Sequence, residues 1–547
     1  MNATTTPADP PAAVREGRAA ALLRSLRSRP GLLLLLFLAA LLPRAWIAWT
    51  SQCISSDGPV YAEVAARYFA GDWQGGLGHL YQPLYPVAMA GAYAVVGDWE
   101  RAGQLVSVLA SSLAILPLWF LTRRLFGERA ALAAALIYAL SPYPVRLSAD
   151  VLTTGLYLAL TLLALWAAVA GFGTWRPGWC LLAGLAAGLS YLVRLDGIVL
   201  GALLAGWSVV WRPREWRAEP RRRALAVAAL GLALAATAGP YLIYLRLDTG
   251  TWMVSRKTPV AYLQTSLSIP DFVAVTKPLD PVPEQNDPTH PSAPEQAPAS
   301  GGFAYKWFSA LRRVLHESAE TCPWQALPLL AAGLWAAFAR GPRRLETLFV
   351  LSIPLAFEAA LWVFSASHQR ESKRYTTPIL VWLLPWFGLG TAWLGDQAAR
   401  RCGSDARRAF AVVLAIALLS LAPKTCQPIG GGRSGEKNAG VWIRDHATTR
   451  PPVIVTNVPR SGFYAGGTMV ALGKTNQFTR EQFRDLIRQA GAHYVVADRW
   501  MEVVCGGFFD WTRDQASGLR LVHSSDTVLG NDEGFDQVRV YEVVPQK

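Results

Sequence analysis

The sequence predicts an α-helical membrane protein with many spans and a small α/β domain at its C-terminal end. Hydrophobic residues make up 52% of the 547 residues and charged residues only 16%, which is too apolar for a water-soluble enzyme of this size. Long apolar runs recur between residues 31 and 424. After residue 424 the runs stop and short strand and helix patterns take their place.

Each apolar run of roughly 17 to 25 residues is long enough to cross a bilayer as one helix. On this criterion we expect about eleven transmembrane helices in a domain covering residues 31–424. They begin near residues 32, 103, 129, 151, 178, 197, 224, 323, 345, 375 and 408. The first run lacks a clear signal-peptidase site, so we expect an uncleaved helix behind a basic cytoplasmic tail, residues 1–30.

The arginines indicate which side of the membrane each loop faces. With the N-terminal tail inside the cell, every predicted inner loop is basic, the longest being "WRPREWRAEPRRR" (211–223). This is the pattern of the positive-inside rule, and it accounts for the net charge of +14 without a nucleic-acid partner. The long outer segments are then 50–102 and 246–322.

Two helical patterns in the first outer segment are not predicted to span the bilayer. "VYAEVAARYFAGDW" (60–73) is amphipathic and follows the turn-forming Gly58 and Pro59, so we expect it to lie on the membrane surface. "PLYPVAMAGAYAVVG" (83–97) is short and interrupted by proline, and we place it along the same surface. In the second outer segment, the proline-rich residues 270–300 are expected to form a flexible stretch.

Residues 425–547 read as an extracytoplasmic α/β domain. "PPVIVTNV" and "AHYVVAD" have the pattern of buried strands, and "FDQVRVYEVV" that of a closing strand. "TREQFRDLIRQAGA" predicts a helix that ends at Gly491.

The ionisable residues near the spans lie at the predicted outer helix ends. Burying a charge in a bilayer is costly, so such residues are the first candidates for function. Asp57, Asp150, Arg194 and Arg374 all fall at outer ends, whereas the span interiors are nearly free of charge, Glu358 being the main exception. A transporter usually carries charges near the midplane, so this distribution favours an enzyme that works at the outer surface.

Both acids also have a purely structural interpretation. "SSDGP" places Asp57 where it could cap the following helix, with Pro59 in the first turn. Asp150 precedes an apolar helix whose N-terminal dipole favours a negative charge. The residues alone leave these alternatives open, and capping does not exclude catalysis.

Five stretches between residues 30 and 395 carry a resemblance to a known family. They are "SDGPVYAEVAARYFAGDW", "LYQPLYPVAMAGAYAVVGD", "LPLWFLTRRLFGERAALAAALIYALSPYPVRLSADVLTTGLYLAL", "YLVRLDGIVL" and "RYTTPILVWLLPWFGLG". Together, and in the same order, they resemble the GT-C integral membrane glycosyltransferases. The nearest group is the dolichyl-phosphate-mannose protein mannosyltransferase superfamily, with its bacterial relatives that add sugars or aminoarabinose to lipid A and other envelope glycans.

The resemblance implies a polyprenyl-phosphate-sugar donor whose lipid tail lies in the bilayer. It also implies an envelope acceptor, a lipid, glycan or protein, on the extracytoplasmic face of a bacterial cytoplasmic (inner) membrane. Asp57 matches the family's catalytic base, and Asp150 its second acidic position, which orients the acceptor or a cation. A carboxylate on the attacking side can take the proton of the acceptor hydroxyl, and a single displacement of this kind inverts the sugar.

The departing polyprenyl phosphate needs positive charge nearby. The candidates are Arg194, Arg256, Lys257, Lys373 and Arg374, of which Arg194 and Arg374 match recurrent basic positions of the family. Gln82 stands before "PLYP" where the aminoarabinose transferases carry a basic residue, which leaves the acceptor open.

No cofactor is indicated by a motif. The chain has neither a D-x-D metal motif nor a phosphate-binding G-x-x-x-x-G-K-[ST] loop, and a divalent cation stays open. Two other functions remain under consideration: a multi-pass transporter or flippase of lipid-linked sugars, and a non-catalytic scaffold of the cell envelope.

Overall fold

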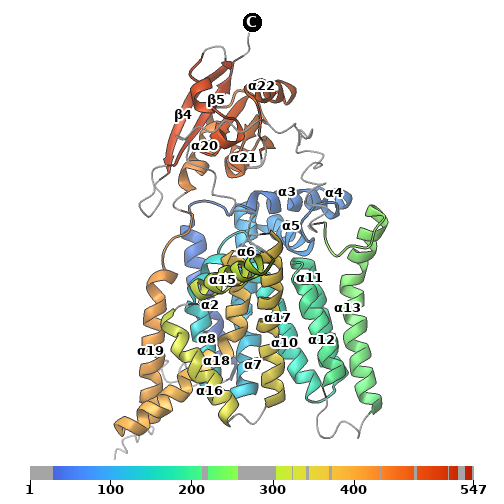
Figure 1. The fold of residues 1–547 in the computed structure, drawn as a ribbon, viewed down its shortest axis with the longest axis vertical. Coiled ribbons are helices and arrows are strands. Elements are labelled where there is room, and N and C mark those ends of the chain that lie inside the picture. The colour runs from blue at the N-terminus through green and yellow to red at the C-terminus, as the bar shows by residue number, and fades with distance from the viewer. Residues whose placement is uncertain are drawn as a thin grey trace, which may run out of the picture.

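The computed structural model shows a bundle of helices that carries a small α/β domain at one end (Figure 1). The structure describes residues 29–211, 220–256, 303–322, 324–340, 344–368, 372–430, 433–472, 477–514, 517–527 and 536–544. The proline-rich residues 270–300 and most of the N-terminal tail therefore lie outside the described residues.

Seven stretches of described helix are long and apolar enough to cross a bilayer. Two pairs of helices, each bent at a short break, raise the number to nine if each pair counts as one span. Two shorter apolar helices, α11 and α12, correspond to the two remaining predicted spans. They stand beside α10 and α13 in Figure 1. The seven are α2 (Arg29–Thr50), α6 with α7 (Trp99–Leu113 and Ile115–Phe126), α10 (Thr154–Phe172), α13 (Pro220–Thr249), α17 (Arg344–His368), α18 (Lys373–Cys402) and α19 (Ala406–Thr425). The bent pairs are α8 with α9 (Glu128–Leu140 and Pro142–Ser148) and α15 with α16 (Phe303–Thr321 and Leu327–Arg340), and the short helices are α11 (Pro177–Val193) and α12 (Gly197–Val210).

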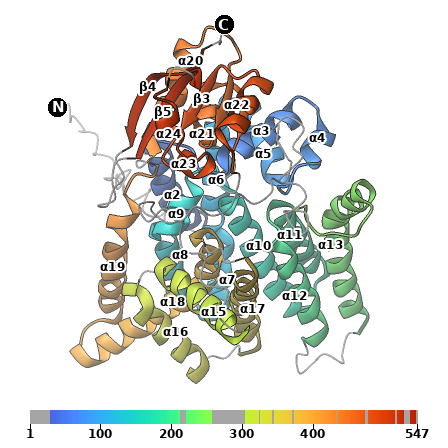
Figure 2. The same cartoon turned by 45° about the horizontal axis from the view of Figure 1, so that its top comes forward.

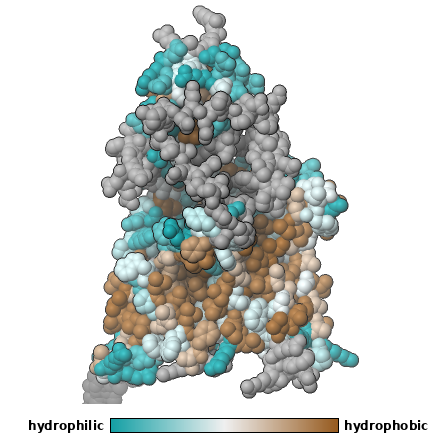
Figure 3. All heavy atoms as spheres, viewed as in Figure 1, coloured by the Kyte–Doolittle hydropathy of each residue, from teal (hydrophilic) through white to brown (hydrophobic). Residues whose placement is uncertain are grey.

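The polar ends of the bundle fit the predicted sidedness. Figure 3 shows hydrophobic side chains across the visible side of the bundle, with hydrophilic ones along its lower margin. The links α7–α8 and α18–α19, the last residues of α12 and the first residues of α13 lie at this end, away from the C-terminal domain (Figure 1). Ion pairs join helices there, Arg124 to Glu346 at 2.9 Å and Arg129 to Asp396 at 3.0 Å. That this end faces the cytoplasm stays a prediction.

An outer layer of short helices covers the opposite end of the bundle (Figure 1 and Figure 2). It consists of α3 (Gly58–Phe69), α4 (Trp73–Leu77) and α5 (Leu84–Val96). One side of α3 packs on α5, and the other meets α21 (Pro459–Ala465) of the C-terminal domain. The helix is therefore covered from two sides, and its contact with the C-terminal domain is one that the sequence does not predict. Its small Ala62 and Ala65 allow this close approach because they add little bulk.

The predicted outer loop 246–322 contains a helix that the sequence analysis does not anticipate. Its described part includes α15, which crosses the bundle at a slant (Figure 1) and packs on α17 and α18. The chain then bends by 83° into α16. α15 is amphipathic and carries charged residues along its outer face, so it has no unbroken apolar run.

The C-terminal domain is a five-stranded sheet with the order β2-β1-β3-β5-β4. β1 is parallel to β2 and β3, whereas β5 is antiparallel to β3 and β4. α20 covers one face, and α22, α23 and α24 cover the other. The bounds are β1 (Val453–Thr456), β2 (Thr468–Ala471), β3 (Tyr494–Ala497), β4 (Leu519–Thr527), β5 (Asp536–Val543), α20 (Ser434–His446), α22 (Arg480–Gln489), α23 (Met501–Val504) and α24 (Phe508–Trp511).

The predicted α/β character of this domain is confirmed. β1, β3, β5 and α22 form where the sequence predicts them, and Gly491 with φ +59° follows α22. β2 and β4, the two edge strands of the sheet, are missed because only one of the four residues of β2 is buried and β4 is largely polar, so neither has the apolar run of a buried strand.

Arg44 is a buried charged residue inside α2. The sequence predicts span interiors that are nearly free of charge and does not single out this residue. Its side chain is fully buried, and Nε donates to the hydroxyls of Ser111 at 2.8 Å and Ser148 at 3.2 Å. The guanidinium also lies 4.5 Å from the ring centroid of Tyr138. Three neighbouring helices thus satisfy the charge, which makes it tolerable in an apolar bundle.

Gly155 marks a close crossing of α10 over α6. A Cβ at this position would lie 2.3 Å from the backbone oxygen of Ser107, so a helix must shift to accept any side chain. We predict that Gly155→Ala lowers the thermal unfolding midpoint of the purified protein, because overpacking costs roughly 1–3 kcal/mol.

Gly91→Ala in α5 is the matched control. A Cβ there meets no described atom within 4 Å, and alanine favours a helix over glycine by about 0.8–1 kcal/mol. Its midpoint should equal or exceed that of the wild type. Equal midpoints for the two variants, measured by differential scanning fluorimetry, would contradict the assigned crossing.

Candidate active site

Asp57 lies directly before α3 but does not cap it. Its carbonyl oxygen accepts the N–H of Tyr61 at 3.0 Å, whereas its carboxylate makes no capping hydrogen bond to the helix. Oδ2 instead lies 2.6 Å from Nη1 of Arg374 in the first turn of α18. Each side chain is 25% exposed, so the pair is partly desolvated and still accessible. The carboxylate is therefore engaged in an ion pair and not in a capping bond, while its role as a catalytic base stays a prediction.

Arg194 lies behind Arg374. It is the residue that ends α11, and its Nη1 donates to the backbone oxygen of Arg374 at 3.4 Å. Its own charge is met by Asp196, with 2.5 Å between Nη2 and Oδ2. The guanidinium lies 5.0 Å from the ring centroid of Tyr157 and 5.3 Å from that of Tyr375. Arg194 is therefore fixed in place and supports the backbone that carries Arg374.

Tyr61 adds a hydroxyl that the sequence does not single out. It lies one turn after Asp57 on the inward face of α3 and is buried. Burial raises the pKa of Tyr61 to about 12, although the nearby Arg374 acts in the opposite direction. The phenol therefore stays protonated at neutral pH. Its one sequence signal is its place on the apolar face of the amphipathic helix.

Asp150 lies at the corner between α9 and α10 and holds the loop that precedes Asp57. Its Oδ1 accepts the backbone N–H of Val151 at 2.7 Å and of Ser55 at 3.0 Å. Burial raises the pKa of Asp150 to about 6, while these two N–H groups oppose the rise. The N-cap of α10 is Thr153, so the contacts of Asp150 do not support the capping interpretation.

The other predicted cations are engaged elsewhere. Lys373, next to Arg374 in the chain, pairs with Glu320 of α15 at 2.8 Å. Arg256 pairs with Asp248 of α13. Lys257 lies outside the described residues. The structure therefore gathers Asp57, Arg374 and Arg194 directly, and Asp150 through Ser55.

No metal centre is evident in the described part of the chain. None of its histidine, cysteine, aspartate and glutamate side chains form a group of three that could hold an ion. Participation of a divalent cation therefore stays as open as the sequence leaves it.

A cavity of about 570 Å³ lies between α3 and the C-terminal domain. Its lining is largely apolar and includes Trp99 and Phe463, with the polar Glu63 and Arg67 on the side of α3. None of the predicted site residues line it. α21 forms part of its wall.

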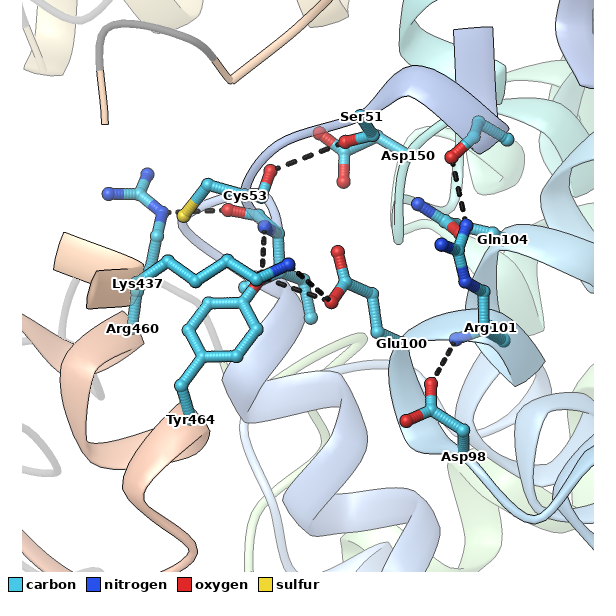
Figure 4. A network of polar contacts seen from close by, with 12 residues as sticks. Ser51, Cys53, Asp98, Glu100, Arg101, Gln104, Asp150, Lys437, Arg460 and Tyr464 are labelled. Atoms are coloured by element: carbon cyan, nitrogen blue, oxygen red, sulfur yellow. Dashed lines mark hydrogen bonds and ion pairs between the residues drawn. The ribbon is translucent and has the colours of Figure 1, made fainter. Parts of the chain in front are cut away.

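A polar network joins the C-terminal domain to the loop before Asp57, and Figure 4 shows its side chains. Tyr464 and Arg460 of α21 reach the backbone of Ile54, and Glu100 of α6 accepts a hydrogen bond from Tyr464. No sequence signal marks these residues, because the contacts join segments up to 410 positions apart.

Comparison with known proteins agrees with this architecture. Residues 82–244 match the family model of the dolichyl-phosphate-mannose-protein mannosyltransferases. This region contains Asp150 and Arg194 but neither Asp57 nor Arg374. No curated protein matches the chain by sequence.

Solved structures match over nearly the whole chain. ArnT from Cupriavidus metallidurans in the apo state has a TM-score of 0.58 at 16% identity, covering 94% of this chain and 99% of that one. The same protein bound to undecaprenyl phosphate has a TM-score of 0.53 at 15% identity, covering 95% and 100%. The oligosaccharyltransferase AglB from Archaeoglobus fulgidus, in complex with an inhibitory peptide and a dolichol-phosphate, has a TM-score of 0.53 at 13% identity, covering 90% and 72%.

At these identities the structural matches show a common fold alone. The chain is thus similar to the dolichyl-phosphate-mannose-protein mannosyltransferases over residues 82–244, less than half of its length, and shares its overall fold with ArnT and AglB.

Proposed function

We propose that the protein moves a sugar from a polyprenyl-phosphate-sugar donor to an acceptor hydroxyl, with Asp57 as the general base. The observation that carries the proposal is the accessible pair of Asp57 and Arg374, 2.6 Å apart, at the end of the bundle that carries the outer layer. Undecaprenyl phosphate in ArnT and dolichol-phosphate in AglB support a lipid-phosphate donor for this fold.

The proposed reaction is a single displacement at the anomeric carbon. The acceptor oxygen forms a bond to this carbon while the bond from the carbon to the phosphate oxygen breaks. The acceptor proton passes to Asp57, and the bonding electrons leave with the polyprenyl phosphate. Arg374 stabilises the charge that develops on this phosphate. The carboxylate of Asp57 thus acts on the acceptor, and the guanidinium of Arg374 acts on the leaving group. The configuration of the sugar is inverted.

The resting ion pair supports this division of roles. Asp57 occupies one N–H of the Arg374 guanidinium, and the buried Nε–H of Arg374 has no hydrogen-bond partner among the described residues. A guanidinium offers five N–H donors and can hold a phosphate as well as a carboxylate. A donor phosphate would draw Arg374 toward itself and free Asp57 to accept a proton.

We place the site on the extracytoplasmic face of a bacterial cytoplasmic membrane. The support is the gathering of arginines at the opposite end of the bundle, in the last turns of α7 and α18 and the first turn of α13, as the positive-inside rule requires. An acceptor on this face is an envelope lipid, glycan or protein. Asp150 acts as a positioning residue in this proposal, because its carboxylate holds the backbone of Ser55.

The first prediction concerns the base. Asp57→Asn should lower transfer by about 10²–10⁴-fold, since an amide cannot take the acceptor proton. The measurement uses purified protein in lipid vesicles, labelled polyprenyl-phosphate sugars and candidate acceptors. Asp98→Asn is the control, because Asp98 caps α6 at the same end of the bundle and asparagine caps equally well.

Undiminished transfer by Asp57→Asn would overturn the catalytic assignment. Movement of intact donor across the vesicle membrane, with no transfer to any acceptor, would identify a flippase instead.

The second prediction compares two adjacent cations of α18. Arg374→Gln should lower kcat/KM by about 10²–10³-fold, because the leaving phosphate loses its nearest cation. Lys373→Gln removes the same charge one residue earlier, where the side chain pairs with Glu320, and should change kcat/KM by a few-fold at most. Equal losses in the two variants would show that overall charge matters and that the contact with Asp57 does not.

The third prediction concerns Asp150 and pH. Its pKa of about 6 lies above the ordinary carboxyl value, so the folded protein holds this proton more tightly than the unfolded chain. The stabilisation by the protonated acid is present at low pH and is lost as the pH rises through about 6.

Asp150→Asn keeps an oxygen for the N–H groups of Ser55 and Val151 but never becomes charged. The thermal midpoint of this variant should therefore rise relative to that of the wild type between about pH 5 and about pH 7.5. A midpoint difference that is the same at both pH values would contradict the assignment.

A further inference from the structure

We infer that Tyr464 and Arg460 of the C-terminal domain are positioning residues that set the place of Asp57. The inference rests on the proposed role of Asp57 as the base. Its starting point is Ile54, three residues before Asp57, whose two backbone polar groups are both held by α21 (Figure 4). The N–H donates to the Tyr464 hydroxyl at 2.7 Å, and the carbonyl oxygen accepts Nε–H of Arg460 at 2.8 Å.

Both side chains are themselves held in place. The Tyr464 hydroxyl donates to Oε2 of Glu100 at 3.0 Å, so its proton points away from Ile54 and its oxygen is left to accept. Lys437 lies 3.9 Å from the same carboxylate oxygen. Arg460, only 6% exposed, pairs through Nη1 with Glu436 at 2.6 Å. Tyr464 and Arg460 are four residues apart, one turn of α21, and so lie on the same face of that helix.

The hold continues along the chain from Ile54 to Asp57. Ser55 donates its N–H to Asp150, and its carbonyl oxygen accepts the N–H of Gly58 at 3.1 Å. Asp57 therefore lies between Ser55 and Gly58, whose backbone groups are both held by hydrogen bonds. A shift of Ile54 cannot be absorbed within the loop without breaking one of these bonds.

The linker into the C-terminal domain touches the same loop. The N–H of Gln52 donates to the carbonyl oxygen of Ile429 at 3.1 Å. Gly430 has φ +80°, and a Cβ there would lie 2.8 Å from the backbone N and O of Cys53. Contacts of the C-terminal segment thus reach three successive residues, 52 to 54, and all three involve the backbone of the loop.

This arrangement does more than attach one domain to another. Apolar contacts would suffice for attachment, whereas hydrogen bonds to both polar groups of one residue fix its position and orientation. A displacement of about 1 Å of a catalytic group can cost about 10²-fold in rate. The expected consequence of loosening α21 is therefore a loss of kcat, with substrate affinity retained.

Tyr464→Phe tests this inference because it removes one oxygen atom and keeps the ring. In the full-length protein in lipid vesicles, we expect kcat to fall about tenfold while the KM values for donor and acceptor stay within about twofold. Tyr541→Phe is the control, since Tyr541 is a buried tyrosine of β5 whose hydroxyl contacts Thr512 at 3.4 Å, away from the loop. It should keep the wild-type kcat.

Arg460→Lys is the second variant. It keeps a positive charge for Glu436 but loses the separate Nε–H that Ile54 accepts. We expect the same pattern, a lower kcat at unchanged KM. Wild-type kcat in both Tyr464→Phe and Arg460→Lys would overturn the inference.

Two measurements distinguish positioning from a general loss of structure. On the background of Asp57→Asn, Tyr464→Phe should lower the residual rate no further, because it acts through the missing carboxylate. A further tenfold loss on that background would overturn the inference. Hydrogen exchange by mass spectrometry should show faster exchange in residues 52–57 of Tyr464→Phe and unchanged exchange in β1 and β3. Unchanged exchange in residues 52–57 would also overturn it.

Failure of the inference is separable from failure of the proposed function. Full transfer by Asp57→Asn removes the base, whatever Tyr464 does. Loss of transfer in Asp57→Asn, together with full kcat in Tyr464→Phe and Arg460→Lys, keeps the base and removes the positioning role.

Discussion

The ion pair of Asp57 and Arg374 is the contact around which the rest of the site is arranged. Its two members are 317 positions apart in the chain and come from a loop and from the start of a long helix. A partly buried pair is favourable only when its geometry is held and its remaining polar groups are satisfied. Asp150 holds the loop, and Arg194 holds the backbone of Arg374, so each member has its own support. Asp150 and Arg194, which the sequence predicts beside the pair, thus hold the backbone next to each of its two members.

The sequence predicts those parts of the molecule that rest on local pattern. The spans follow from apolar runs, α22 from the helical pattern of "TREQFRDLIRQAGA" that ends at Gly491, and β3 from a short run of apolar residues. The side of the bundle on which Asp57 and Arg374 lie also follows, because the span count places both at outer ends. The partners of Arg44, Tyr464 and Arg460 leave no such pattern, since hydrogen bonds to a distant hydroxyl or backbone group impose no periodicity on either segment.

The direction of a side chain is a second property that span counting does not give. Lys373 and Arg374 are neighbours in the first turn of α18, and successive residues of a helix point about 100° apart. Arg374 therefore faces Asp57, whereas Lys373 faces Glu320. Which of the two faces inward depends on the rotation of α18, and that rotation is set by its packing against α8 and α16. The close approach of Gly388 to Ala130 and of Gly390 to Leu329 shows how little freedom this packing leaves.

α21 connects the C-terminal domain to two features of the outer layer at once. Gly462 and Phe463 line the cavity above α3, while Arg460 and Tyr464, on either side of them in the chain, hold Ile54. α21 has only seven residues and is too short to bend between these contacts. A displacement of α21 at the cavity is therefore expected to displace Ile54 as well. Such a displacement would strain further hydrogen bonds, because the Tyr464 hydroxyl also bonds to Glu100 and the Arg460 guanidinium also bonds to Glu436. Under the positioning role inferred for Tyr464 and Arg460, a movement of the C-terminal domain therefore changes the position of Asp57 as well.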